Sequence, residues 1–323
     1  MSSICVSSVS KQVKKRTGWF RKSSETLLDQ VNLEVMGGEF VAILGKNGSG
    51  KSTLLKCIAG MIHPNQGDVF IFGKNSFKHR SVLTKEMGIF FGQKSLIFTD
   101  LRAIDYLNLL KKIYGLNEEE FKFMFNMVDR HMPCSDLLEK EVRGMSYGEK
   151  VKIEILSIVL HKPKLLILDE PFVGLDPASQ NNLLQFIHEY RKSFNPTILL
   201  TTHQFLEVLS QVDRAVIIDK GKKTYDGKVD QLVESYYKKK LISVTWAKPL
   251  KNHLNEVMQG VHILKQTEVD IELEVELEKH SIQEVIAYLL KKGEIADFEI
   301  RSLSIDKVVE SLYEDHSTLS RTI

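Results

Sequence analysis

The chain of 323 residues has few cysteines and few aromatic residues, and its positive and negative charges nearly cancel. Its three cysteines, Cys5, Cys57 and Cys134, lie far apart without a Cys-x-x-Cys pair, which excludes a sequence-evident zinc site and fits a reducing compartment. The net charge of +2 gives no global field for nucleic acid, so we expect no nucleic-acid partner. No apolar run approaches the ~20 residues of a membrane span, and the first residues do not begin a signal peptide. We therefore expect a soluble, intracellular protein.

The most informative segment is rich in glycine. It lies between an apolar β-rich run at 39–44 and a helix-compatible run at 54–59, and it consists of Gly45, Lys46, Asn47, Gly48, Ser49, Gly50, Lys51, Ser52 and Thr53. Strand, glycine-rich loop and helix in this order are the context of a P-loop, whose N–H groups surround a triphosphate. The helix N-terminus adds about half a positive charge. Lys51 can then reach the β- and γ-phosphates and Ser52 can join the Mg²⁺ shell, so we predict binding of a nucleoside triphosphate.

A second segment fits the same chemistry. The apolar run at 165–168 predicts a strand buried on both faces of a parallel sheet, and Asp169 and Glu170 follow it directly. Asp169 is expected to bind Mg²⁺ directly or through water, and Glu170 to polarise the attacking water. Two adjacent acids at a strand end are usually only solvated, but the P-loop upstream favours the catalytic interpretation.

Strands and helices alternate through this region, which predicts a doubly wound α/β core. Asp176 and Pro177 indicate the N-cap and first turn of a helix to about 192, and strands are expected at 197–201, at 215–219 and near 224–225. Between about 95 and 160 helical periodicity replaces the strand signal. We expect a helical subdomain there, inserted into the nucleotide-binding core.

The composition changes after the three lysines at 238–240. The pattern predicts a strand at 241–246, a helix at 250–258, strands at 261–264 and 269–277, and a helix at 285–290 after a capping box of Ser281 and Glu284. A strand around Phe298 and Ile300 and a helix after Ser304 complete a β-α-β-β-α-β order, which suggests a ferredoxin-like domain. The predicted division is a basic N-terminal extension at 1–26, an ATPase domain at 27–238 and a small α+β domain at 239–323.

Further motifs resemble the ATP-binding cassette (ABC) family specifically. They are the signature-like Ser146, Tyr147, Gly148 and Glu149, the Q-loop Gln93, the D-loop Asp176 and the switch His203. Each motif alone is weak, since a lone histidine after a strand is usually structural. Their common order behind a P-loop leaves little room for chance.

The resemblance covers roughly residues 27 to 235 and implies a mechanism. Two cassettes, copies of this chain or of a similar one, would pair head to tail, with each ATP between one P-loop and the other subunit's signature helix. ATP binding would close the dimer and hydrolysis would release it. The resemblance implies that Glu170 acts on the water, that His203 holds the γ-phosphate, and that Gln93 binds Mg²⁺ and links the site to the helical subdomain.

Two places depart from the family pattern. Tyr147 replaces the first signature glycine and Glu149 replaces the glutamine, so we expect an active site with altered affinity. Trp19 and Phe20 lie further ahead of the expected strand at 28–35 than the usual adenine-stacking aromatic, separated from it by a polar basic insert. Either could stack on the base, and we favour Phe20. The basic residues around this insert are either a solvated loop or a contact with anionic lipid headgroups or another subunit.

Within the family the chain most resembles the ATPase subunits of bacterial ABC-2 type exporters with a small C-terminal domain, by residues 87–95, 100–101 and 303–309. This implies a cytoplasmic subunit on the inner face of the cell membrane that energises a permease on separate chains. Alternatives are a cassette ATPase acting on ribosomes or DNA, a P-loop kinase or GTPase, and a membrane-bound ATPase that moves no solute. The chain has one cassette and no long coiled coil, which argues against the first alternative, and the signature argues against the second.

Overall fold

The structure is a computed structural model that describes residues 2–16, 22–92, 97–202, 208, 211–229, 239–250, 254 and 257–302. The chain divides into two units, Met1–Gly227 and Lys228–Ile323. Each unit has its own cluster of buried apolar side chains. The boundary between the units lies a little ahead of the boundary at 238/239 that the composition suggested.

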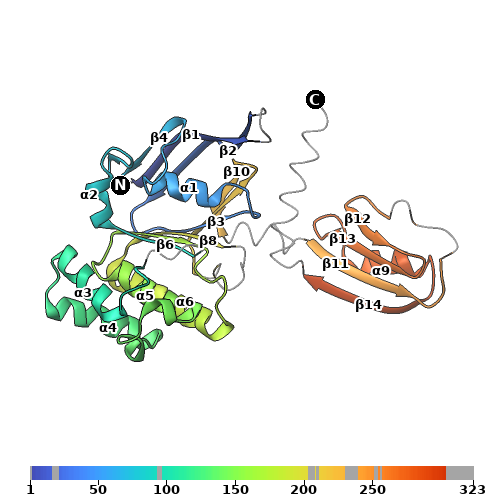
Figure 1. Cartoon of the computed structure of the whole chain (residues 1–323). Coiled ribbons are helices and arrows are strands. Elements are labelled where there is room, and N and C mark those ends of the chain that lie inside the picture. Colours follow the sequence, from blue (N-terminus) through green and yellow to red (C-terminus); the bar gives the residue numbers. More distant parts are fainter. Residues whose placement is uncertain are drawn as a thin grey trace. The chain divides into compact units, whose positions relative to one another are not determined.

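A six-stranded sheet forms the centre of the first unit (Figure 1). In sheet order its strands are β10 (Lys222–Lys228), β9 (Arg214–Asp219), β3 (Phe40–Leu44), β8 (Thr197–Thr202), β7 (Leu165–Asp169) and β6 (Met87–Phe91). The neighbours from β9 to β6 are parallel, and β3, β7 and β8 are fully buried. Their continuous apolar runs are what burial on both faces requires. The expected alternation of strands and helices is therefore present.

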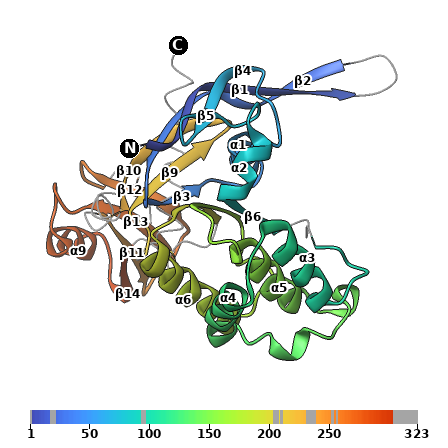
Figure 2. The same ribbon diagram turned by 90° about the vertical axis from the view of Figure 1, so that its left-hand side faces the viewer.

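A second, antiparallel sheet covers one face of this core. It consists of β2 (Lys22–Met36), β1 (Ser2–Arg16), β4 (Gln66–Ile71) and β5 (Lys74–Asn75) in that order, and helix α1 (Lys51–Ile58) lies between the two sheets (Figures 1 and 2). The sequence predicts a basic extension over residues 1–26. In the structure, Ile4, Val6 and Val9 of β1 are instead buried in the common core. The core is thus a mixed α/β arrangement in which a sheet, and not only helices, covers one face.

Helices occupy the opposite face and the inserted region (Figure 2). They are α3 (Ala103–Tyr114), α4 (Glu118–His131), η2 (Ser135–Leu137), η3 (Val142–Gly144), α5 (Tyr147–Val159) and α6 (Pro177–Phe194). The short α2 (Arg80–Leu83) and η1 (Thr84–Glu86) precede β6, and α2 lies instead on the side of α1, where its Leu83 belongs to the same buried cluster (Figure 2). Within residues 97–160 the structure has helices and an isolated Arg102–Glu141 bridge but no strand, as expected. Among the helices described, none is both long and apolar enough to cross a bilayer.

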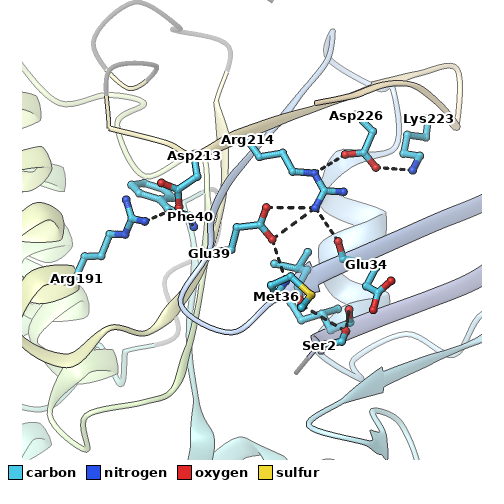
Figure 3. Close-up of polar contacts among 12 residues, drawn as sticks. Ser2, Glu34, Met36, Glu39, Phe40, Arg191, Asp213, Arg214, Lys223 and Asp226 are labelled. Carbon is cyan, nitrogen blue, oxygen red and sulfur yellow. Dashed lines mark hydrogen bonds and ion pairs between the residues drawn. The ribbon is translucent and has the colours of Figure 1, made fainter. Parts of the chain in front are cut away.

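Charged side chains form ion pairs and hydrogen bonds at the amino ends of strands β3 and β9 (Figure 3). Arg214 Nη1 lies 3.2 Å from Glu39 Oε1 and donates to the backbone oxygen of Glu34 at 2.9 Å, and its Nε lies 2.5 Å from Asp226 Oδ1. The carboxylate of Asp213 accepts from the Phe40 N–H at 2.9 Å. These contacts lie at the amino edge of the parallel strands, so the carboxyl edge is left for a ligand, as is usual in open α/β sheets.

The second unit contains an antiparallel sheet and one described helix. In sheet order the strands are β12 (Val261–Gln266), β13 (Asp270–Glu276), β11 (Lys239–Trp246) and β14 (Ile295–Ser302), and α9 (Ile282–Leu290) connects β13 to β14. The predicted capping box is confirmed, since Ser281 and Glu284 exchange hydrogen bonds. The predicted alternation is also confirmed in β13, where Ile271, Leu273 and Val275 are buried. The expected helix at 250–258 lies largely outside the described residues, and the expected helix after Ser304 lies entirely outside them.

Candidate functional site

The P-loop connects the carboxyl end of β3 to the first turn of α1. Gly50 is the N-cap of α1 with φ +112°, and a Cβ there would lie 2.5 Å from the backbone oxygen of Leu27. Because other residues rarely adopt this φ and have no room here, glycine is required. The loop borders a pocket of 330 Å³ at the carboxyl edge of the sheet. The pocket is lined by Leu27, Asn47, Gly48, Ser49, Gly50, Lys51, Ser52, Thr53 and Glu170.

Lys51 is folded back onto the loop from which it projects. Its Nζ donates to the backbone oxygens of Gly45 at 2.6 Å and Lys46 at 3.1 Å, and it lies 3.8 Å from the Glu170 carboxylate. Burial lowers the pKa of Lys51, and the negative charges of Glu170 and Asp169 partly offset this effect. The ammonium is thus held at the site by partners that a phosphate can replace.

The end of strand β7 brings Asp169 next to the P-loop. Its Oδ1 accepts hydrogen bonds from Ser52 Oγ at 3.1 Å and from Thr201 Oγ1 at 2.6 Å. The Glu170 N–H donates to Thr201 Oγ1 at 2.9 Å. Thr201 is fully buried on β8 and holds both acidic residues. No local motif marks Thr201 in the sequence; the parallel register that pairs Asp169 with Thr201 is the signal that identifies it.

Glu170 has a strained backbone. Its φ is +52°, in the left-handed region that residues other than glycine seldom occupy. Such a conformation costs about 1 to 2 kcal/mol, so surrounding contacts must maintain it. The Glu170 N–H donates to both the backbone oxygen and the side-chain hydroxyl of Thr201, and these hydrogen bonds maintain the conformation. The strain directs the chain sharply away from β7 and leaves the carboxylate on the wall of the pocket.

The residues of this pocket fit a nucleotide phosphate and Mg²⁺. Ser49 Oγ is buried, and among the described residues it has no hydrogen-bond partner, as expected of a group that awaits a ligand. Ser52 Oγ and the Asp169 carboxylate are hard oxygen donors of the kind that Mg²⁺ prefers. The described residues contain no cluster of three or more His, Cys, Asp or Glu side chains that could hold a metal. Mg²⁺ in nucleotide sites usually takes one or two protein ligands together with phosphates, and this donor set matches that requirement.

The signature segment forms the start of α5. Ser146 is the N-cap, and it exchanges hydrogen bonds with Glu149: its Oγ accepts from the Glu149 N–H at 3.3 Å, and its own N–H donates to Glu149 Oε2 at 2.8 Å. The ammonium of Lys140, at 2.9 Å, and the Ser146 N–H lower the pKa of Glu149 to about 2. The substituted Glu149 therefore acts as a capping residue, and Tyr147 and Gly148 present the first free N–H groups of the helix.

Of the other predicted site residues, the structure describes Asp176 but not Gln93, His203 or Phe20. Asp176 caps α6 as predicted: its carboxylate accepts from the Ser179 N–H at 3.0 Å and the Ser179 hydroxyl at 2.6 Å, and these bonds lower its pKa. Gln93, His203 and Phe20 lie outside the described residues.

Comparison with known proteins gives a consistent result. The sequence profile of the family described as ABC transporter matches residues 28–173. The chain is 32% identical over 205 residues to the ABC transporter ATP-binding protein NatA of Bacillus subtilis, covering 64% of this chain and 83% of NatA. It is 26% identical over 283 residues to the linearmycin resistance ATP-binding protein LnrL of the same organism, covering 88% of this chain and 90% of LnrL.

Solved structures share the fold. A dimeric ATP-binding cassette in a post-hydrolysis state, bound to ADP and phosphate, superposes with a TM-score of 0.62 at 22% identity. The match covers 70% of this chain and 98% of that cassette.

Proposed function

This chain belongs to the family of ABC transporter ATP-binding proteins, and from this premise we propose that it is the ATPase subunit of an exporter whose permease is on separate chains. One observation is the main support for a role in export. The alignment with LnrL, which is named for resistance to linearmycin, spans 88% of this chain. It therefore extends beyond the cassette into the second unit. ABC-2 type exporter subunits with a small C-terminal domain, which the sequence also resembles, have this organisation.

Within the ATPase site each residue has a proposed role. Ser49 and Lys51 bind the phosphates of ATP, and Ser52, Asp169 and Gln93 would hold Mg²⁺, which would supply positive charge beside the phosphate oxygens. Glu170 takes the proton of the attacking water, and His203 holds the γ-phosphate. Thr201 orients Asp169 and Glu170. The hydrogen-bonded contacts among Ser52, Asp169 and Thr201, and the adjacent Glu170, support this assignment.

The complete site needs a second subunit. The free N–H groups at the start of α5 are suited to a phosphate, because a helix N-terminus attracts anions. The mechanism implied for the family assigns that phosphate to the ATP of a second cassette, either another copy of this chain or a similar one. The Ser146 hydroxyl uses its acceptor capacity for the cap and retains its proton for such a ligand.

The helical subdomain is the proposed contact with the permease. It follows Gln93, so its position can respond to bound ATP. Phe98 is 61% exposed and meets the buried Tyr106 edge to face, with ring centroids 6.1 Å apart. An exposed aromatic supported by a buried one provides an apolar anchor for a cytoplasmic helix of the permease. The subunit would thereby be held on the inner face of the cell membrane.

Co-purification tests this proposal. Leu101→Asp places a charge beside this anchor and should weaken the interface by about 2 kcal/mol, roughly 30-fold in affinity. The variant should keep its basal ATPase activity but lose co-purification with membrane proteins encoded by neighbouring genes. Leu264→Asp, the same change at a 50% exposed leucine of the second unit, is the control and should co-purify. Normal assembly of Leu101→Asp would place the contact elsewhere.

For the second unit we propose a ferredoxin-like domain at about 239–323 that stabilises the dimer. The sheet order β12-β13-β11-β14 with only antiparallel pairs supports this, as does the connection of β13 to β14 through α9. Limited proteolysis should cleave between the ATPase domain and this unit. Deletion of residues 239–323 should weaken dimers in ATP more than it weakens ATP binding, and equal dimerisation would contradict the proposed role.

A further inference from the structure

Tyr147 occupies the position of a glycine in the resembled family, and its side chain contacts its own subunit. Its hydroxyl donates to the backbone oxygen of Gly92 at 3.1 Å. Its ring lies against Gly174, where a Cβ would come within 3.0 Å of a ring carbon. Burial raises the pKa of the Tyr147 phenol above its ordinary value, so the phenol is protonated and donates at neutral pH. One side chain thus joins the first turn of α5 to the loops that follow β6 and β7.

Both loops are packed against the hydrolytic end of β7. The Gly92 N–H donates to the backbone oxygen of Asp169 at 3.1 Å, and a Cβ on Gly92 would lie 2.9 Å from the backbone oxygen of Glu170. In the other loop, the N–H of Val173 donates to the backbone oxygen of Glu170 at 3.3 Å. Short backbone contacts therefore run from Asp169 and Glu170 to the tyrosine. A contiguous set of packed and hydrogen-bonded groups of this kind can carry energetic coupling between two sites, which a measurement of coupling then tests.

We propose that Tyr147 is a positioning residue that couples ATP bound at the P-loop to the signature helix of the same subunit. This rests on the proposed function, in which the P-loop binds ATP and the start of α5 faces the ATP of the partner subunit. In the dimer, each ATP would then influence the position of the residues that complete the other site. A glycine at this position has no side chain to make the contact. The substitution thus adds a link between the two sites and leaves the N–H groups of the helix available.

Two variants can distinguish a coupling role of Tyr147 from a role in packing alone. Tyr147 is 40% exposed, so its hydroxyl adds little to the core of the subunit. Tyr147→Phe removes the hydrogen bond to Gly92 and keeps the ring on Gly174. Tyr190→Phe is the matched control, because the Tyr190 hydroxyl also donates to a backbone oxygen, that of Pro163 at 3.4 Å, and its removal leaves the contacts at β7 intact.

Hydrogen–deuterium exchange of the full chain tests the inference. It is measured with and without Mg²⁺ and a non-hydrolysable ATP analogue, at a protein concentration where size-exclusion chromatography shows a monomer. In the parent and in Tyr190→Phe, the analogue should change exchange in the peptide 145–156 by about fivefold, the factor that one hydrogen bond is worth. In Tyr147→Phe this change should disappear, while protection of the P-loop peptide stays the same in all three proteins.

The outcomes distinguish the inference from its premise. An unaltered response of the peptide 145–156 in Tyr147→Phe, or no response in the parent, would overturn the coupling role. Failure of the analogue to protect the P-loop in any protein would instead overturn the proposed ATP site. A second measurement is steady-state hydrolysis, where kcat of Tyr147→Phe should fall about fivefold with unchanged affinity of the monomer for ATP. A residue of only structural importance would lower the melting temperature and leave the ATP-dependent exchange intact.

Discussion

The P-loop region and the signature region differ in how much of their chemistry one chain completes. At the P-loop, the charged side chains of Lys51 and Asp169 are buried and already paired: Lys51 is 4% exposed and Asp169 is 8% exposed. The signature segment is a capped helix start, and the side chain of its Tyr147 is 40% exposed. Its polar contacts hold the helix start in place and leave the N–H groups of its first turn without intrahelical partners. The described contacts of the first region lie within the subunit, whereas the proposed function assigns the second region a ligand bound to another subunit.

This difference indicates which region should control ATP binding and which should control dimer closure. Groups that are positioned before ATP arrives can bind it without reorganisation, so the P-loop region should determine affinity. In the proposed function the signature region gains its ligand only when two subunits meet, so it should determine closure. Substitutions in the two regions are therefore expected to separate binding and hydrolysis from dimer formation.

The largest effect is expected at Glu170. Glu170→Gln keeps the shape of the side chain but cannot accept the proton of water, so hydrolysis should fall by roughly 100-fold or more. ATP binding should persist, and dimers should accumulate in ATP on size-exclusion chromatography. Glu119→Gln, at an exposed position of α4, should behave as the parent. Turnover at the parent rate would show that another group takes the proton.

Lys51→Ala should weaken ATP binding by about 2 kcal/mol, roughly 30-fold, because the ammonium is a charged donor to the phosphates. Fluorescence titration with a labelled ATP analogue measures this loss. Lys56→Ala removes a cation from the other end of α1 and should bind normally. Unchanged affinity of Lys51→Ala would contradict the assignment of the P-loop.

Thr201→Val should lower kcat about tenfold and the free energy of unfolding by about 1 to 2 kcal/mol, because the hydroxyl that holds Asp169 and the Glu170 N–H is lost in a buried site. Thr201→Ser retains the hydroxyl and should recover most of the rate. The two variants are compared by steady-state hydrolysis and chemical denaturation. Equal rates for valine and serine would mean that shape alone positions the acids.

The smallest effect concerns Glu149 and depends on pH. Its pKa in the folded protein is lowered to about 2 from 4.5, so its contribution is present above pH 4.5 and is lost as the pH falls toward 2. At neutral pH, Glu149→Gln should reduce the free energy of unfolding by about 0.5 kcal/mol. Denaturation at several pH values should show the difference from the parent vanish in acid. A difference that grows on acidification would have the wrong sign.

Several features of the chain could be read from local sequence, because their signals are close together in the chain. The P-loop, the Asp169–Glu170 pair and the caps at Asp176 and Ser281 each depend on residues within a few positions of one another. The role of Thr201 was not visible in this way, because it arises from the register of β7 and β8, whose paired residues Asp169 and Thr201 are far apart in sequence.

The sequence by itself determined the strand–loop–helix order, the inserted helical region and the capping residues, since hydrophobic period, glycine conformation and side-chain caps act locally. Only the tertiary structure decided that β1 completes a second sheet over α1 and that Tyr147 contacts Gly92 and Gly174. These contacts join residues from separate elements, and burial of apolar surface in a common core brings them together. A local pattern specifies what an element is, whereas long-range packing specifies which other elements it touches.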